Sequence, residues 1–337
     1  SSVIYMTDMF YNCQNLISIN LANINTSLVK NMRSMFCNCY SLAQLDLSSF
    51  DTSKVTKMEF MFYECQSLKK LNLSHFNTSQ VENMEVMFYR MYSLEDLDIS
   101  HFDTSKVTDM SWMFFYCENL ISLDLSSFNT SSVKNMSLMF TYNYKLESLD
   151  IPNFDTSNVL SMDRMFRECQ SLTSLDVSSF DTSKVTSMRF MLFNCTKLKS
   201  LNLSNFRTPN VLEMNEIFWK CRELTSLDIS NFDTSHIKDM YGFFGYCNNL
   251  KSLDLSHFNT SNAEDMEGMF FDCYSLISLN LTNFDASNVN SLSQFFYNCK
   301  KLSLLDLTNF NTKNVEDMST MFFRCHKLES LDLSKFD

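Results

Sequence analysis

Aspartates recur at intervals of 26 residues in this chain of 337 residues, and four consecutive copies are Asp98, Asp124, Asp150 and Asp176. If the copies stack like strands, about 4.8 Å apart, neighbouring carboxylates repel by roughly 0.9 kcal/mol in water. That repulsion is large enough to raise their pKa values or to attract cations along the run. We take these four residues as candidate ligand-binding residues. The alternative is an evenly polar, solvated face, which is how charged surface positions usually behave.

A second candidate set consists of tyrosines at one position of the same repeat. Tyr92 and Tyr144 share this position with Tyr40 and Tyr274, while other repeats have Gln, Glu, Arg or Lys there. Variation within a rigid frame is typical of recognition, although unconstrained surface drift explains it equally well. Another repeat position is mostly aromatic and holds Tyr11, Tyr63, Tyr89, Phe115, Phe193, Trp219, Phe271, Tyr297 and Phe323. These rings either pack between neighbouring repeats or form a partly exposed, sticky patch.

The cysteines are placed like core residues. Eleven of the 12 share one repeat position, and Cys37 lies outside it. There is no CxxC pair and no histidine cluster, and this position falls on the apolar side of the repeat, where free cysteine behaves as a small hydrophobe. We expect buried, reduced thiols, with Cys37 the first to react. Such thiols give no information on the redox compartment.

Catalytic chemistry has no candidate residues. The five histidines are scattered among repeat positions, and three glycines are too few for a phosphate-binding loop of the usual Gly-rich kind. No activated nucleophile or acid–base pair can be identified. We therefore predict a protein that is not an enzyme, with no cofactor and no metal site.

The elements that carry these residues follow from the period itself. Met-Phe or a close substitute occurs thirteen times, from Met9-Phe10 to Met321-Phe322, always 26 residues apart. A fixed period of this length is typical of a solenoid, in which each repeat packs on its neighbours. Within the type unit 42–67, the stretch 45–48 alternates apolar and polar like a strand, whereas the apolar residues of 55–65 recur at helical spacing. The prediction is an α/β, leucine-rich-repeat-like solenoid of about 13 repeats, with a parallel sheet on the concave side and short helices on the convex side.

Two other repeat positions support this arrangement. Phe50 has phenylalanine counterparts in almost every repeat, and we expect them to form a buried aromatic spine. Asp or Asn occupies the position of Asp51 in twelve of thirteen repeats, usually followed by Thr-Ser just before the expected helix. Such residues cap helix starts, each cap contributing about 0.5 to 2 kcal/mol.

Bulk properties restrict the partners. The formal net charge is -12, so binding to nucleic acid is not expected, and no apolar run is long enough for a membrane span. The uninterrupted period predicts one repeat array over residues 1–337. Because the chain starts and stops inside a repeat, without the atypical caps of a solenoid, we expect it to be an excerpt of a longer protein.

The unit from Ser41 to Cys65 resembles the repeat of BspA-like leucine-rich repeat surface proteins. The shared motif is LxxLDLSxFDTSxVxxMxxMFxxC, and the resemblance covers the whole chain. It implies secretion or display at the cell surface, and adhesion to host proteins, matrix or other cells. The family often has Ser-Gly just before Met-Phe; Gly268 keeps that glycine, but Phe60, Trp112 and Phe190 are bulky.

Three functions follow as hypotheses. The first is a non-catalytic, extracellular or surface-displayed binding scaffold, whose partner is a host surface or matrix protein or a glycan. The second is a structural spacer within a surface protein. The third is a cation-dependent, glycan-binding face built on the carboxylates of Asp98, Asp124, Asp150 and Asp176.

Overall fold

The computed structural model describes residues 2–307 and 310–336, which divide into two compact units. Unit 1 comprises residues 1–159 and 165–172, and unit 2 comprises residues 160–164 and 173–337. The strands of unit 1 are β1 (Ser18–Ile19), β2 (Gln44–Leu45), β3 (Lys70–Asn72), β4 (Asp96–Asp98), β5 (Ser122–Asp124) and β6 (Ser148–Asp150). The strands of unit 2 are β7 (Ser174–Leu175), β8 (Ser200–Leu201), β9 (Ser252–Asp254), β10 (Ser278–Asn280) and β11 (Leu304–Asp306).

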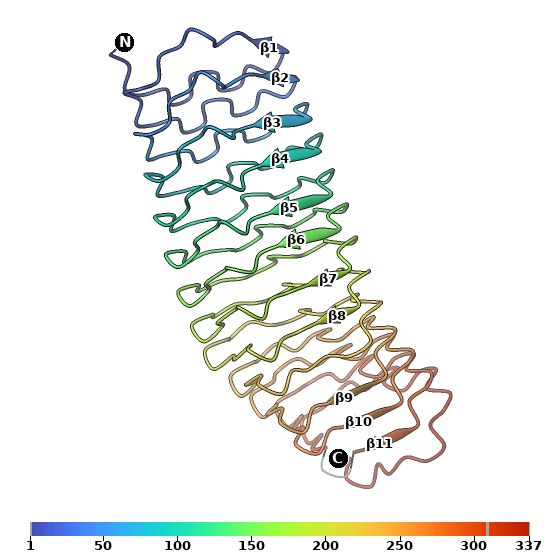
Figure 1. Ribbon diagram of the computed structural model, residues 1–337. Coiled ribbons are helices and arrows are strands. Elements are labelled where there is room, and N and C mark those ends of the chain that lie inside the picture. The colour runs from blue at the N-terminus through green and yellow to red at the C-terminus, as the bar shows by residue number, and fades with distance from the viewer. Residues whose placement is uncertain (1, 308–309, 337) are drawn as a thin grey trace. The chain divides into compact units, whose positions relative to one another are not determined.

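In unit 1 the strands stack in chain order (Figure 1). They pair in parallel as β1–β2, β3–β4 and β5–β6, and each residue pairs with the residue 26 positions later, as Leu123 does with Leu149. A second ladder of single parallel bridges joins the turns at Asn31, Lys57 and their counterparts up to Asn135. The strand prediction is therefore confirmed in register, as pairs of short strands.

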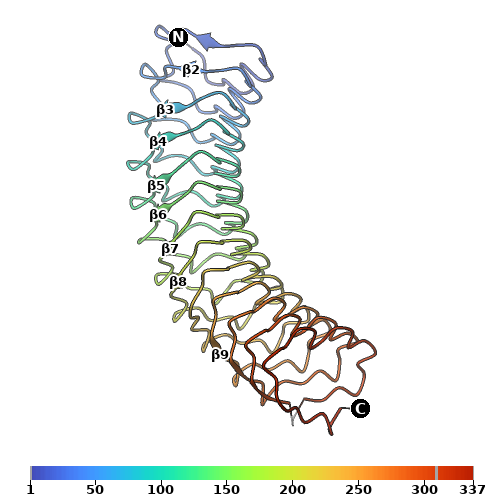
Figure 2. The ribbon, with the colours of Figure 1, turned by 90° about the vertical axis from the view of Figure 1, so that its right-hand side faces the viewer.

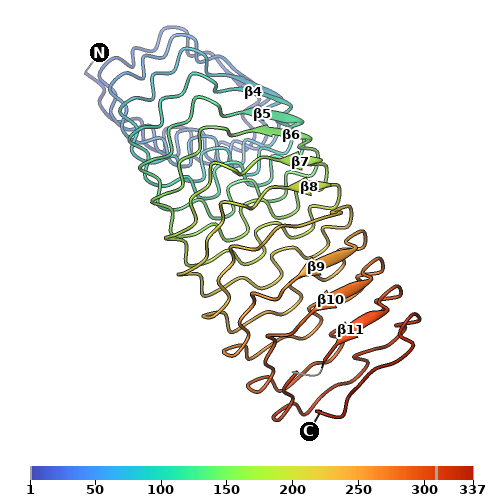
Figure 3. The same cartoon turned by 60° about the horizontal axis from the view of Figure 1, so that its bottom comes forward.

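Unit 2 has the same organisation. β7 pairs with β8, and β9, β10 and β11 form a three-stranded parallel sheet, visible side by side in Figure 3. The bridge ladder recurs at Ser161, Ser187 and Glu213 and again at Asp239 and Asp265. Each unit is thus a leucine-rich-repeat-like parallel β-solenoid.

The predicted helices are wrong, because no helix occurs among residues 2–307 and 310–336. The segment opposite the strands in unit 1 is instead a zigzag of turns (Figure 2). Alternate amides there donate to the next repeat: Phe62 N lies 3.1 Å from Met87 O and Glu64 N lies 2.7 Å from Tyr89 O. A helix would need these amides for its own carbonyls. The described part of the chain accordingly contains no helix long and apolar enough to cross a membrane.

The predicted helix caps have a different role. Asp51 Oδ1 accepts a hydrogen bond from Ser53 N at 2.9 Å, which closes a local Asx turn. The buried Thr52 hydroxyl donates to Asn77 O at 3.0 Å and accepts from Asn77 N at 2.7 Å. The Asp-Thr-Ser motif therefore stabilises turns and links successive repeats, and it begins no helix.

Phenylalanines form the centre of the core. The predicted spine is buried, with Phe50 only 3% and Phe128 1% exposed. A closer stack is formed by the phenylalanines of the Met-Phe pairs. In unit 1 it runs from Phe10 to Phe166, with ring centroids 5.4 to 5.9 Å apart and planes within 10° of parallel. Offset stacking of this kind adds about 0.5–1.5 kcal/mol per pair beyond the burial of area.

The cysteine thiols also bridge repeats. Cys65 Sγ donates to Phe36 O at 3.2 Å, and the same contact recurs at other copies of this repeat position. Asn143 stands at one of these copies, and its side-chain amide replaces the thiol and donates to Phe114 O at 3.0 Å. No cysteine in the described part of the chain forms a disulfide. The expectation that Cys37 is the most accessible thiol is wrong, because Cys37 is 5% exposed while Cys13 and Cys325 are half-buried.

Candidate functional site

The predicted carboxylate run is divided between the two units. Asp98, Asp124 and Asp150 end strands β4, β5 and β6 of unit 1, and all three are exposed. Asp124 and Asp150 are register partners, and the charge of Asp98 acts to raise the pKa of Asp124. Asp176 directly follows β7 and belongs to unit 2. The structure therefore brings three of the four residues together.

Most of these carboxylates are already occupied by their own turns. Asp124 Oδ1 accepts from Ser126 N at 2.9 Å, and hydrogen bonds from the side chain and backbone of Ser126 hold the pKa of Asp124 below its usual range. Asparagine makes the same turn, since Asn72 Oδ1 accepts from Ser74 N at 3.0 Å. The recurrence of Asp or Asn at this position is thus explained by the turn that follows the strand.

Asp150 differs from the other carboxylates of the run. The residue two positions later is Pro152, which has no N–H and cannot close the Asx turn. Neither oxygen of Asp150 is therefore used in such a turn, and the side chain is exposed. For metal binding, no group of three or more His, Cys, Asp or Glu residues in the described part of the chain is arranged to hold an ion.

The predicted tyrosines lie in turns of unit 1 that precede strands β4 and β6. Tyr92 and Tyr144 both contact a third tyrosine, Tyr116, whose ring centroid lies 5.6 Å from that of Tyr92 and 5.9 Å from that of Tyr144. The hydroxyls of Tyr116 and Tyr144 are 3.4 Å apart, and the ring of Tyr142 lies 4.5 Å from that of Tyr116. All four tyrosines are half-buried. The structure therefore joins the two predicted residues into one tyrosine cluster.

This cluster continues into a stack of rings. Tyr63, Tyr89 and Phe115 lie face to face, with centroids 4.7 and 4.8 Å apart and planes within 6° of parallel. Trp112 packs beside Phe115 at 4.8 Å, and Phe115 contacts Tyr142 at 5.3 Å. We call this surface the aromatic face of unit 1, composed of Phe60, Tyr63, Tyr89, Tyr92, Trp112, Phe115, Tyr116, Tyr142 and Tyr144.

Arginines border the aromatic face. The guanidinium of Arg33 lies 5.5 Å from the ring centre of Phe60, that of Arg90 5.2 Å from Tyr89, and that of Arg167 5.8 Å from Tyr142. Arg90 also pairs with the buried Glu64 at 3.0 Å. Burial, followed by the charge of Glu64, raises the pKa of Tyr63 to about 12. The face therefore presents protonated hydroxyl donors, flat apolar rings and positive charges.

Sequence reasoning identified Tyr92 and Tyr144 in one column and the stacked rings in another, but it missed the residue that connects them. Tyr116 and Tyr142 occupy a repeat position that also holds Tyr246 and elsewhere has Asn, Asp, Glu, Arg or Lys. The available signal was local density, because residues 112–116 contain four aromatic side chains.

The fold and this surface define a leucine-rich-repeat-like β-solenoid with aromatic residues on its turn side. The chain belongs to the family described as "Mycoplasma protein of unknown function, DUF285", whose model matches residues 1–97, 90–201, 191–302 and 270–337. No curated protein matches the sequence.

Several solved structures of bacterial repeat proteins are similar. One is a leucine-rich cell surface protein from Faecalibacterium prausnitzii A2-165, with 17% identity, coverage of 89% of this chain and 75% of the other, and a TM-score of 0.45. Another is a leucine-rich-repeat protein from Bacteroides ovatus ATCC 8483, with 15% identity, coverage of 92% and 78%, and a TM-score of 0.46. A third comes from Eubacterium ventriosum ATCC 27560, with 16% identity, coverage of 94% and 78%, and a TM-score of 0.42.

Proposed function

We propose that this chain is a non-catalytic binding scaffold, secreted or displayed at the cell surface, that adheres to host or matrix components through the aromatic face of unit 1. The observation that carries the proposal is the contact of Tyr92 and Tyr144 through Tyr116, on a surface bordered by Arg90 and Arg167. Tyrosine and arginine dominate the binding energy of protein interfaces, because they give a large contact area together with polar groups.

The half-burial of these rings strengthens the proposal. Neighbouring rings hold Tyr116 and Tyr142 in place, so little side-chain entropy is left to lose when a partner docks. The resemblance of the repeat motif to BspA-like surface proteins supports display outside the cell. The acidic net charge of -12 favours basic or neutral partners.

A cation-dependent, glycan-binding face on the strand side is the second candidate. It is favoured by Asp150, whose carboxylate cannot close the Asx turn, beside its register partner Asp124. Against it, the Asp98 and Asp124 carboxylates each already accept hydrogen bonds from the serine two residues later.

The two faces can be tested separately with matched variants. One variant carries Tyr92→Ala and Tyr144→Ala, and the other carries Asp124→Asn, Asp150→Asn and Asp176→Asn, with exposed Lys251→Ala as control. Binding to immobilised matrix proteins and to a glycan array is measured with and without calcium. Removing two tyrosine anchors is expected to weaken binding by about tenfold or more. Calcium-dependent binding lost only in the aspartate variant would establish the second candidate. No binding of any ligand by the folded chain would support a structural spacer instead.

A further inference from the structure

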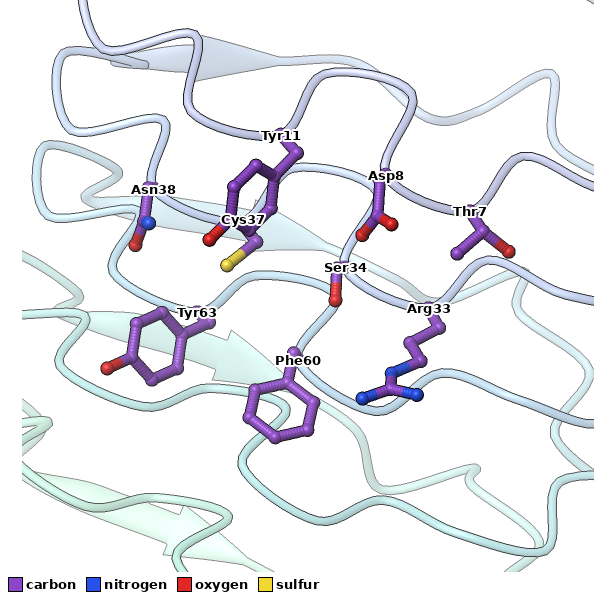
Figure 4. Close-up of a pocket in the computed structure, with 9 residues that line it drawn as sticks. All are labelled: Thr7, Asp8, Tyr11, Arg33, Ser34, Cys37, Asn38, Phe60 and Tyr63. Carbon is purple, nitrogen blue, oxygen red and sulfur yellow. The ribbon is translucent and has the colours of Figure 1, made fainter.

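A pocket of about 650 Å³ opens on the turn side of unit 1, at the edge of the aromatic face, with which it shares Phe60 and Tyr63. Tyr11, Cys37 and Tyr63, which come from three successive repeats, line it together with Phe60 and Arg33 (Figure 4). Asp8, Thr7, Ser34 and Asn38 complete the wall. In Figure 4 the Cys37 thiol lies between the rings of Tyr11 and Tyr63.

The pocket lies where one ring of the aromatic stack is missing. Tyr63, Tyr89 and Phe115 occupy consecutive copies of a repeat position and stack 4.7 and 4.8 Å apart. Tyr11 and Cys37 occupy the two preceding copies of the same position. Because cysteine is much smaller than tyrosine, this column has no ring between those of Tyr11 and Tyr63.

Unit 2 shows what happens when a small residue stands at this position. Gly245 is the counterpart of Cys37 there, and the indole of Trp219 fills the space it leaves. A Cβ atom on Gly245 would lie only 2.2 Å from Trp219 Cζ3. Trp219 then lies on Phe271, two repeats away, with centroids 6.3 Å apart and planes 26° from parallel. An indole ring therefore closes such a gap within this same fold.

In unit 1 the corresponding small residue Thr141 is followed directly by an aromatic residue, Tyr142. Tyr142 turns beside it and contacts Phe115 at 5.3 Å, and Thr141 is fully buried. Cys37 is followed by Asn38 where Thr141 is followed by Tyr142, and the pocket lies here, with Cys37 lining it while only 5% exposed. Tyr11 is the counterpart of Trp219, but a pocket lies beside Tyr11 and Tyr63, whereas Trp219 lies on Phe271.

The charges around the pocket suit a neutral ring that carries a hydrogen-bond donor. Asp8 and Arg33 bring opposite charges to the wall, and the carboxylate of Asp8 is an exposed acceptor. Burial, and then the charge of Asp8, raises the pKa of Cys37 to about 12, so the thiol stays neutral and apolar. A neutral ring avoids the desolvation cost that a charged group would meet between Tyr11 and Tyr63.

We propose that the slot between Tyr11 and Tyr63 binds the indole ring of a tryptophan side chain supplied by a protein partner. The inference rests on the proposed function for the existence of that partner, but it concerns a site separate from Tyr92 and Tyr144. Tyr11 is 51% exposed and Tyr63 is half-buried, and both residues line the pocket. Stacking of a ring on each face supplies the affinity.

The test uses small probes and needs no identified partner. Binding of indole and of N-acetyltryptophanamide to the full chain is measured by ligand-observed NMR and calorimetry. Cys37→Tyr supplies the missing ring and is expected to weaken binding by at least about tenfold, whereas Cys37→Ser keeps the slot open and retains binding within about twofold. Tyr11→Leu removes one ring face and is expected to weaken binding by about fivefold. Lys54→Tyr adds an exposed tyrosine elsewhere and leaves binding unchanged.

Several results would overturn the proposal. These are no saturable binding of either probe to the folded wild-type chain, unchanged binding in Cys37→Tyr, or tetramethylammonium binding as tightly as indole, which would indicate a cation cage instead. If Cys37→Tyr fails to fold, Tyr11→Leu decides, because Tyr11 is largely exposed. The Tyr92→Ala, Tyr144→Ala variant is expected to bind the probes normally. Indole binding in a chain that adheres to nothing would refute the proposed function while preserving the slot.

Discussion

At the scale of single residues, Trp219 and Gly245 of unit 2 show how closely the turns are packed. The Trp219 ring lies 5.0 Å from the ring of Tyr246 and 6.0 Å from that of Tyr241, measured between centroids. It cannot move away from a new methyl group without disturbing these contacts. Gly268 is a natural comparison, because the nearest atom to its added Cβ is Phe271 Cβ at 3.7 Å.

We therefore predict that Gly245→Ala destabilises the protein by about 1–3 kcal/mol through overpacking against Trp219. Gly268→Ala is expected to cost about 1–2 kcal/mol for a different reason, the left-handed backbone at φ +60°. Trp219→Leu should reduce the destabilisation caused by Gly245→Ala and leave the destabilisation caused by Gly268→Ala unchanged. Urea unfolding of the single and double variants measures this coupling, and additive effects of Gly245→Ala and Trp219→Leu would contradict the prediction.

At the scale of the element, the strand side was predictable from the sequence and the turn side was not. Leu45 and its counterparts alternate with polar residues, which fixes both the strand and its register. The apolar residues Val55, Met58, Met61, Phe62 and Cys65 were correctly assigned to the core, and all are buried. Their spacing of three and four residues is shared by a helix and by a chain of turns, so it could not distinguish the two.

The information that decides between them lies in the backbone. Each repeat has two residues with positive φ, such as Phe60 at 60° and Glu64 at 55°, and among the described residues most of these are not glycine. Left-handed conformation is unfavourable for side chains such as those of Phe60 and Glu64, so these residue types give no sign of it. Gly242 and Gly268 stand at the first of these positions, where other repeats have bulky residues such as Phe60 and Trp112. The tyrosine cluster was equally hard to predict, because Tyr116 also has a left-handed backbone (φ 60°) at a repeat position whose residue type varies.

Left-handed positions on the turn side offer a second prediction. Gln294 is half-buried with φ 59°, and replacing it with glycine removes the backbone strain. Gln294→Gly is expected to raise the free energy of unfolding by about 0.5–1 kcal/mol. In the same repeat, exposed Lys301 is not among the residues with positive φ, and Lys301→Gly should lower stability by a similar amount. Thermal unfolding of both variants checks the contrast, and destabilisation by both would contradict it.

At the scale of the whole molecule, the repeated Asx turns couple folding to acid pH. Hydrogen bonds from serine side chains and backbone amides lower the pKa values of many aspartates, among them Asp98, Asp124, Asp176 and Asp228. A carboxyl whose folded pKa is depressed stabilises the fold above its unfolded pKa of about 3.9. That contribution is lost as pH falls through the lower, folded value. The small contributions of the individual carboxyls to the free energy of unfolding add, because the turn is repeated.

We expect the buried thiols to set the alkaline limit of stability. Burial raises the pKa values of Cys117, Cys221 and Cys273 to about 12. A thiol whose folded pKa is raised contributes stability below its unfolded pKa of about 8.5, and that stability is lost as pH rises towards the folded value. Ionised thiols cannot donate to the carbonyls that they bridge, such as Phe88 O, which Cys117 Sγ contacts at 3.0 Å.

The prediction is a plateau of stability between about pH 4.5 and 8, with a decline on both sides. Urea unfolding from pH 2.5 to 11 at 0.15 M salt measures it, the salt limiting general repulsion from the net charge of -12. Asp98→Asn, Asp124→Asn and Asp176→Asn together should flatten the acid limb only, since asparagine makes the same turn without titrating. Cys117→Ala and Cys221→Ala should flatten the alkaline limb only. An acid limb unchanged by the asparagine substitutions would show that acid unfolding has its origin outside the Asx turns.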